Sequence, residues 1–527
     1  MRLASVLASC LLLASAAASA LTPDDLHKLA SAESAGKLVD QIDTIVARGD
    51  PADAAVLRGL LEGRLWALGD QVLLDEGGAV RDLVSGKVVA ELPADAEKIS
   101  INNRVRRSLE RGLAALGLFA PGAPERLAAA RSLQDSGDAE QLPLVARALA
   151  VEKDPQVKET LLSVQGALLL ASPRASERLA AIEILLRDPT TRNRRLLVER
   201  VSPETDENVR QALTAGIQRI DRSLARAEVI GWVFGGLSLG SVLLLAALGL
   251  SITFGLMGVI NMAHGELLMI GAYATYVVQT FFRAHLPGAL SFYLLAAAPI
   301  AFLAAAFAGM LLEIFVVRPL YGRPLETLLA TWGASLLFIQ IVRGIFGAQN
   351  VEVANPPWMS GGVKAMPGLV LPYNRLAIIA FAVAVLCIVW LLLERTRLGL
   401  LVRAVMQNRG IAGGLGVSTP WIDRLAFALG GGIAGLSGCA LSQIGNVGPE
   451  LGQGFIVDSF MVVVLGGVGQ LAGTVIAAAG LGQVNKLLEP YAGAVLAKIA
   501  VLAFIIVFIQ RRPQGLFAPR GRAAEEA

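Results

Sequence analysis

Hydrophobic and polar positions follow two different patterns in the two halves of the chain. From about 21 to 225, apolar residues recur at helical spacing among many Ala, Arg, Glu and Asp residues, which is typical of amphipathic helices in water. From 229 to 510, apolar residues form long runs with few charges, which is typical of transmembrane helices. We therefore predict an all-α fold in which a helical soluble domain, 21–225, precedes a polytopic membrane domain, 229–510, and a polar tail, 511–527.

Short polar stretches divide the membrane domain into apolar segments. The expected segments are Val229–Leu250, Gly265–Phe282, Phe292–Val317, Leu325–Phe346, Leu376–Leu393, Leu425–Ile444, Ile456–Leu488 and Ala494–Gln510. Arginines follow the third, the fifth and the last of these segments, and the positive-inside rule places those ends in the cytoplasm. An exported soluble domain and a cytoplasmic tail then require an odd number of crossings.

The segment Ile456–Leu488 is interrupted by Gly466-Gly467-Val468-Gly469, so it forms either a re-entrant loop or two short crossings. Ile456–Leu465 would extend only about 15 Å as a helix, half of the roughly 30 Å hydrocarbon core. We favour a broken, partly re-entrant arrangement with Leu256–Met262 as its counterpart. Interrupted hydrophobic segments in two halves of a transporter point to the transport pathway.

Residues 1–20 have the features of a secretory signal peptide, with Arg2, the apolar run Leu3–Ala17 and the small residues Ala18-Ser19-Ala20. The alternative is an uncleaved anchor, but an apolar run this short favours cleavage. Leu7-Ala8-Ser9-Cys10 resembles a lipoprotein box, although further apolar residues follow it and a chance match is favoured. The soluble domain is therefore expected outside the cytoplasm.

Two pairs of segments in the soluble domain match at a single offset of 52 residues. Glu125–Leu133 resembles Glu177–Leu185, and Asp154–Leu161 resembles Asp206–Leu213. Two independent matches at one offset indicate an internal repeat of helix pairs, similar to HEAT-type repeats, which stack into a protein-binding solenoid. A small β-hairpin around Gly77-Gly78 is expected before the repeats, and a scaffold or docking role is favoured for the domain.

The stretch Gly255–Tyr273 places polar residues at the centre of an apolar tract. A carboxylate at mid-bilayer costs about 2.5–3.5 kcal/mol on insertion scales, so Glu266 should face protein or a water-filled cavity. The glycines of this stretch make a continuous helix doubtful, so either the helix is broken here or two of its faces are polar. Both alternatives make the stretch protein-lined. The candidate residues of a substrate pathway are Asn261, His264, Gly265, Glu266 and Asn446.

Composition narrows the possible chemistry. The net charge of +3 is too small to indicate nucleic-acid binding, and the three cysteines, in the signal or in apolar segments, form neither a disulfide framework nor a metal-binding spacing. Gly430–Gly435 contains G-x-G-x-x-G, but no strand precedes it, so we reject a dinucleotide-binding site. No P-loop occurs in the chain, so ATP hydrolysis is expected on another polypeptide. We expect no enzyme activity, cofactor or metal on this chain. Candidate positions for close helix packing or helix breaks are Gly258, Gly431, Gly435, Gly466, Gly467 and Gly469.

The linker 394–423 is basic, amphipathic and expected in the cytoplasm. A short helix that ends in a glycine cluster between two spans can lie along the membrane and dock another protein, and an ordinary interfacial helix is the alternative. Helix formation over Gly410–Gly416 is in doubt, because each glycine costs about 1 kcal/mol relative to alanine. The candidate docking residues are Arg403, Gln407, Asn408 and Arg409.

Three motifs resemble those of a known family. Gly258-Val-Ile-Asn-Met-Ala-His-Gly-Glu266 resembles the signature of the branched-chain amino-acid permease family of bacterial ABC importers, and Val464–Gly473 and Arg512–Phe517 resemble its C-terminal pattern. The resemblance covers about 229–520. The long exported domain together with Gln510–Arg522 resembles the B-type permease subunits of urea ABC transporters.

The resemblance implies an importer of the bacterial inner membrane that takes up urea for nitrogen. It implies that the chain pairs with a second permease, two cytoplasmic ATPases and a periplasmic substrate-binding protein, and that the linker is the coupling helix that fits a cleft on an ATPase. Whether the signature residues contact the substrate or shape the break stays open. Few ion-pairing groups lie in the apolar segments, which favours a neutral substrate.

Three alternatives remain open. The same kind of machine can carry branched-chain amino acids or short amides. A stand-alone channel or carrier would show uptake that is insensitive to ATP depletion. A receptor would bind its ligand on the exported solenoid and would transport nothing, and the family motifs argue against it.

Overall fold

The computed structural model describes residues 21–517 except 33, 70, 78, 90, 91 and 94. Residue contacts divide the chain into two compact units with the boundary between Ala225 and Arg226. We call them the N-terminal unit and the membrane unit and describe each by itself. The expected signal peptide, the tail beyond 517 and Gly78 of the expected hairpin lie outside the described residues.

Helices form most of the N-terminal unit, and polar N-caps begin several of them. Ser34, Asn102 and Asp154 each accept a hydrogen bond from a backbone N–H group in the first turn of the following helix, which satisfies a donor that has no partner within the helix. The helices are α2 (Pro23–Ala30), α3 (Ala35–Arg48), α4 (Ala54–Leu61), α5 (Asn103–Gly117), α6 (Ala123–Ser136), α7 (Leu142–Val151), α8 (Pro155–Leu170), α9 (Ala175–Leu185), α10 (Thr191–Val201) and the part of α11 (Glu207–Met257) that precedes the boundary.

A small antiparallel sheet lies between α4 and α5 in the chain. Its strands are β1 (Leu65–Leu68), β2 (Gln71–Asp75), β3 (Val80–Asp82), β4 (Val88–Val89) and β5 (Glu97–Lys98), in the order β4-β3-β2-β1-β5. The expected hairpin is β2–β3, with Leu73 opposite Asp82. The structure adds three strands that the sequence did not reveal, because runs of two to four residues are too short to show an alternating pattern.

The 52-residue offset recurs in the contacts of two arginines. Arg126 donates to both carboxylate oxygens of Glu152, at 2.7 and 3.0 Å, and to the carbonyls of two residues just before α6. Arg178 donates in the same way to Glu204, at 2.9 Å to each oxygen, and to the carbonyls of two residues just before α9. We call these two pairs the repeat clamps.

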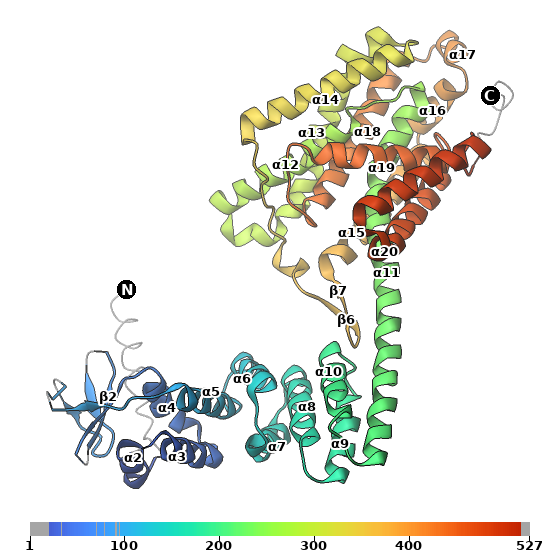
Figure 1. The fold of residues 1–527 in the computed structure, drawn as a ribbon. Helices are drawn as coiled ribbons and strands as arrows, with labels where there is room; N and C mark the ends of the chain where they lie inside the picture. Colours follow the sequence, from blue (N-terminus) through green and yellow to red (C-terminus); the bar gives the residue numbers. More distant parts are fainter. Residues whose placement is uncertain are drawn as a thin grey trace. The chain divides into compact units, whose positions relative to one another are not determined.

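Each repeat clamp joins the first helix of a set of three to the residues that lead into the third. Figure 1 labels the six helices, α6 to α11, of the two sets. Arg126 lies on α6, and its partner Glu152 accepts from two backbone N–H groups just before α8. Arg178 lies on α9, and its partner Glu204 accepts from two backbone N–H groups just before α11. The sets are therefore α6–α7–α8 and α9–α10–α11. Three helices fill each 52-residue interval, not the helix pair expected from sequence.

Asp53 is a buried carboxylate whose two oxygens lack a hydrogen-bond partner in the described part of the chain. Burial raises the pKa of this group from 3.8 to about 6, repulsion from the carboxylate of Asp50 adds to the rise, and attraction to Arg48 opposes it. The folded state thus holds this proton more tightly than the unfolded state does. Protonation of Asp53 therefore contributes fully to the stability of the folded state below about pH 4, and this contribution is lost as the pH rises through about 6.

We expect this one group to lower the free energy of unfolding by about 2–3 kcal/mol between pH 4 and pH 7. Thermal unfolding of the purified protein and of Asp53→Asn at the two pH values checks this, and the asparagine variant should lose most of the difference. Glu152 acts in the opposite direction, because the side chain of Arg126 lowers its pKa to about 2 and its contribution is lost as the pH falls below about 4.5, but this loss is the same in both proteins and cancels in their comparison. Equal pH dependence in both proteins would contradict the assignment.

The membrane unit contains the remainder of α11, followed by nine further α-helices and a hairpin in the described residues. They are α12 (His264–His285), α13 (Tyr293–Leu312), α14 (Pro324–Phe346), the hairpin of β6 (Gly362–Met366) and β7 (Leu369–Pro372), α15 (Tyr373–Arg395), α16 (Arg397–Gln407), α17 (Arg409–Gly414), α18 (Thr419–Leu441), α19 (Leu451–Gly466) and α20 (Leu471–Arg511). Six helical segments of the described chain are long and apolar enough to cross a bilayer, and α12, with its polar residues, is not among them. The predicted helical membrane domain is confirmed.

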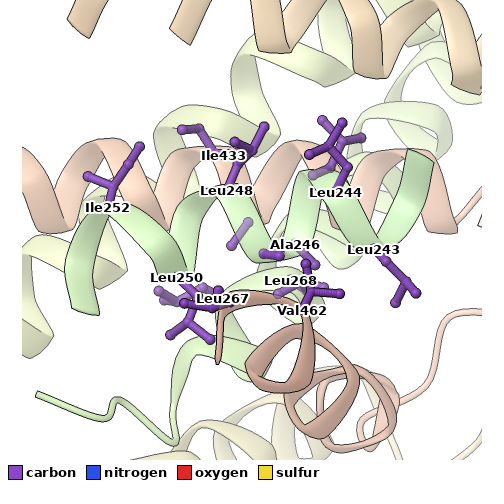
Figure 2. Close-up of a cluster of buried hydrophobic side chains, with 14 of the residues drawn as sticks. Leu243, Leu244, Ala246, Leu248, Leu250, Ile252, Leu267, Leu268, Ile433 and Val462 are labelled. Atoms are coloured by element: carbon purple, nitrogen blue, oxygen red, sulfur yellow. The ribbon is translucent and has the colours of Figure 1, made fainter. Parts of the chain in front are cut away.

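The core of this unit is built around α11, α12, α13, α18 and α19. Figure 2 shows leucines of α11 interleaved with Leu267 and Leu268 of α12, Ile433 of α18 and Val462 of α19. Glycines let α18 approach its neighbours closely. A methyl group on Gly431 would lie 2.8 Å from the carbonyl oxygen of Ala305, and one on Gly435 would lie 2.4 Å from that of Ala301, both on α13.

The interrupted tract 456–488 consists of two helices that meet at a turn. α19 ends at Gly466, Gly467 has φ of +98°, and α20 begins at Leu471. Gly466 and Gly473 touch backbone to backbone, so the end of α19 packs against the start of α20. The expected last segment, Ala494–Gln510, is the part of α20 after a kink at Gly493.

Candidate functional site

The chain is broken between α11 and α12, at the centre of the polar stretch. α11 ends at Met257, Gly258 has φ of +63°, and α12 begins at His264. Glycine suits this position because a side chain disfavours positive φ. Of the two alternatives left by the sequence, the structure thus has the broken helix.

The three polar residues of the break are all buried. Asn261 and Glu266 are 1% exposed and His264 is fully buried. The Asn261 side-chain oxygen accepts from the N–H of Ala263 at 3.1 Å, within the segment that leads into α12. His264 donates through Nε2 to the carbonyl oxygen of Ala246 on α11 at 3.0 Å, because a carbonyl oxygen only accepts. The bond of His264 ties α12 to α11 across the break.

α14 supplies a row of hydroxyl groups to this region. The hydroxyl of Ser335 donates to Oε1 of Glu266 at 2.9 Å, and the hydroxyl oxygen of Thr331 accepts from the N–H of Met262 at 3.2 Å. Thr327, Thr331 and Ser335 are buried although most of α14 is not. Sequence reasoning missed them, and their spacing of four residues within an apolar helix was the available signal.

Several buried polar atoms around the break lack a hydrogen-bond partner in the described part of the chain. They are Nδ2 of Asn261, Nδ1 of His264 and Oε2 of Glu266, and the hydroxyl of Tyr273, nine residues along α12 from His264, is a further buried atom without a partner. An unpaired buried polar group costs about 1–3 kcal/mol, so such groups point to an unseen partner such as water or a solute. The three atoms at the break comprise a donor, the amide of Asn261, and two acceptors.

The two remaining pathway candidates are Gly265 and Asn446, and only Gly265 lies next to the break. Gly265 lies where a methyl group would be 2.5 Å from the carbonyl oxygen of Gly452, so it allows α12 and α19 to touch. Asn446 is exposed between α18 and α19 and shares no hydrogen bond with Asn261 or Glu266 among the described residues. Asn261, His264, Gly265 and Glu266 thus lie at the break as neighbours in sequence and contact different elements, whereas Asn446 lies apart from them.

The linker forms two helices, α16 and α17, joined at Asn408 in an extended conformation. The side chain of Asn408 caps α17 by accepting from the N–H of Ile411 at 2.9 Å, which helps the glycine-rich turn to form in spite of its composition. Gln407 is exposed at the end of α16. Arg403 donates to the carbonyl oxygen of Leu393 at 2.5 Å and lies 3.4 Å from a carboxylate oxygen of Glu394.

Arg409 differs from the other candidate docking residues because its side chain is bound within the unit. It pairs with Asp423, and side-chain exposure is 30% for Arg409 and 3% for Asp423. The outward surface of α17 is apolar instead, with Ile411 62% and Leu415 80% exposed. Gly469, in the turn between α19 and α20, contacts Gly255 of α11 backbone to backbone.

Known proteins resemble the membrane unit. The family model described as branched-chain amino acid transport system / permease component matches residues 232–510. The high-affinity branched-chain amino acid transport system permease protein BraD of Pseudomonas aeruginosa is 27% identical over 287 residues, covering 53% of this chain and 93% of that protein. The corresponding permease protein LivH of Escherichia coli K12 is 27% identical over 291 residues, covering 54% and 94%.

The N-terminal unit lies outside the residues that the family model matches. The probable branched-chain amino acid transport permease protein LivH of Methanocaldococcus jannaschii is 24% identical over 302 residues, covering 54% of this chain and 90% of that protein. No solved structure matches the chain significantly. Because the family model covers more than half of the chain, the chain belongs to the family of permease components of branched-chain amino acid transport systems.

Proposed function

We propose that this chain is a permease subunit of an ATP-driven importer and that its substrate is urea. The observation that carries the proposal is the set of unpartnered buried polar atoms at the break between α11 and α12, next to Glu266 and Ser335. Urea is small and neutral, and it both donates and accepts hydrogen bonds. Amide, carboxylate and hydroxyl groups in this region can replace its hydration shell as it crosses.

The charge of the site supports a neutral substrate. Ser335 is the hydrogen-bond partner of Glu266 in the described structure, and no ion pair joins Glu266 to an arginine or lysine there. The carboxylate of an amino acid would be left without a counter-ion at such a site. Branched-chain amino acids are nevertheless the second candidate, because the names of the relatives state this substrate class.

The proposal assigns a place to each part of the chain. The N-terminal unit is exported to the periplasm as a HEAT-like repeat domain, where it meets the substrate-binding protein. The membrane unit pairs with a second permease in the inner membrane of a bacterium. α17 docks on a cytoplasmic ATPase subunit through Ile411 and Leu415, since exposed apolar side chains on a short helix are suited to insertion into a cleft.

Uptake of labelled urea and labelled leucine, in cells that express the complete transporter set, tests the proposal. We expect ATP-dependent urea uptake that disappears without this chain and falls at least ten-fold in Glu266→Leu, because leucine removes the hydrogen-bonding groups at the break but keeps a similar volume. Asn446→Leu is the matched control and should retain uptake, since Asn446 is exposed and apart from the break.

The outcomes separate the candidates. Leucine uptake that depends on this chain, with urea uptake unchanged, would transfer the assignment to branched-chain amino acids. Uptake that survives depletion of ATP would identify a channel or carrier and refute the ATP-driven importer. Full activity of Glu266→Leu would remove the break from the pathway.

A further inference from the structure

Arg409, at the start of α17, forms a paired and stacked contact inside the membrane unit. Its terminal nitrogens donate to both carboxylate oxygens of Asp423, at 2.5 and 3.0 Å. Its guanidinium carbon lies 4.3 Å from the ring centroid of Tyr321. Two parallel hydrogen bonds and stacking on an aromatic ring together require a planar guanidinium, which lysine lacks.

A second arginine holds the same end of α18 from another side. Arg318 donates to both oxygens of Glu313, at 3.0 and 2.7 Å, and to the carbonyl oxygen of Pro420 at 3.3 Å. Glu313 is 1% exposed and directly follows α13. The first turns of α18 are thus bound to the end of α13 through Pro420 and to α17 through Asp423.

From this end, α18 continues into the core beside the helix that carries Glu266. A methyl group on Gly438 would lie 1.9 Å from the carbonyl oxygen of Leu268 on α12, so the two backbones are in direct contact. Close-packed helices transmit small displacements because their contacts leave no free space. A movement of α17 therefore has a continuous path of contacts, through Asp423 and α18, to α12.

We infer that Arg409, Asp423 and Tyr321 form a latch that transmits movement of α17 to α18 and α12. Arg409 is then a positioning residue inside this permease, and the contact with an ATPase is left to the exposed Ile411 and Leu415. The inference rests on the proposed function, because a movement of α17 has a consequence for transport only if an ATPase drives it.

The test uses the complete importer in proteoliposomes, with labelled urea and labelled leucine in parallel. Uptake, ATP hydrolysis and co-purification of the ATPase subunits are measured for Arg409→Gln, Arg409→Lys, Asp423→Asn and the double variant R409Q/D423N. We expect every variant to retain the ATPase subunits and ATP hydrolysis, while uptake per ATP falls at least ten-fold in both neutral single variants. Arg409→Lys should fall less, because it keeps the charge but not the fork and the stacking.

The double variant separates a latch from a merely structural ion pair. It leaves no uncompensated buried charge, so a structural defect would be repaired in it, whereas the broken latch would still uncouple uptake from hydrolysis. Ile411→Ser is the contrasting control and should release the ATPase subunits. Recovery of coupling in the double variant, normal uptake in Arg409→Gln, or loss of the ATPase subunits from that variant would each overturn the latch. Absence of ATP-dependent uptake by the unmodified importer would instead refute the proposed function.

Discussion

Replacing Arg178 by alanine should destabilise the N-terminal unit by about 3 kcal/mol. The variant leaves Glu204 buried without the guanidinium that now donates to both of its oxygens, and removing one partner of a buried ion pair costs about 3–5 kcal/mol. The lower end applies because two backbone N–H groups still donate to Glu204 and Arg200 remains 4.0 Å away. Denaturant unfolding of the purified protein measures the change.

Arg174→Ala provides the matched control in the same helix–helix connection. Its partner is Glu177, and the arginine side chain is 76% exposed, so the loss should stay below about 0.5 kcal/mol. If Arg178→Ala were as mild as Arg174→Ala, the repeat clamp would contribute no stability and the shared geometry at Arg126 would be incidental.

A single methyl group added to Gly438 should separate α12 from α18 and cost about 3 kcal/mol, the upper part of the usual range for overpacking. The new carbon would lie 1.9 Å from the carbonyl oxygen of Leu268 and 2.8 Å from the nitrogen of Ala272, and neither backbone atom can turn away as a side chain would. Gly438→Ala should therefore unfold at a lower temperature in detergent, which a thermal scan monitored by size-exclusion chromatography detects.

The opposite sign is expected for Gly333→Ala on α14, where the added methyl group meets nothing within 4 Å. Alanine is favoured over glycine in a helix interior by about 0.5–1 kcal/mol, so this variant should match or exceed the parent protein in stability. Equal behaviour of the two alanine variants would show that the close approach of α12 and α18 does not limit stability.

The helical character of both units was predictable because it depends on the periodic spacing of apolar residues that are close in sequence. Features that form through contacts between distant residues were not predictable. The 52-residue offset was visible in short matching segments, but three helices in each interval became evident only when Arg126 and Arg178 were seen to repeat their contacts. The short strands around β2 carry too few residues for a pattern. The offset therefore revealed the length of the repeat but not its helix count.

The candidate site shows the same limit. The polar residues and glycines near Gly258 are neighbours in sequence, so a break was visible as one of two alternatives, and the structure decides for it. Ser335 and Thr331 meet the break from 69 residues away, and their four-residue spacing in an apolar helix does not reveal which distant segment they contact. Arg409 was placed with the docking residues because a basic linker suggests an outward surface, whereas its partner Asp423 is 14 residues further along the chain.

The repeat clamps also restrict how the N-terminal unit can change its length in evolution. Each clamp joins an arginine to a glutamate 26 residues later, and the second clamp begins 26 residues after the first ends. An insertion or deletion between the arginine and the glutamate of one clamp would move the guanidinium away from its carboxylate and bury an uncompensated charge. Loss or gain of a whole 52-residue set keeps every pair intact, so relatives that carry such a unit should change in length by whole sets or within the segment between the two clamps.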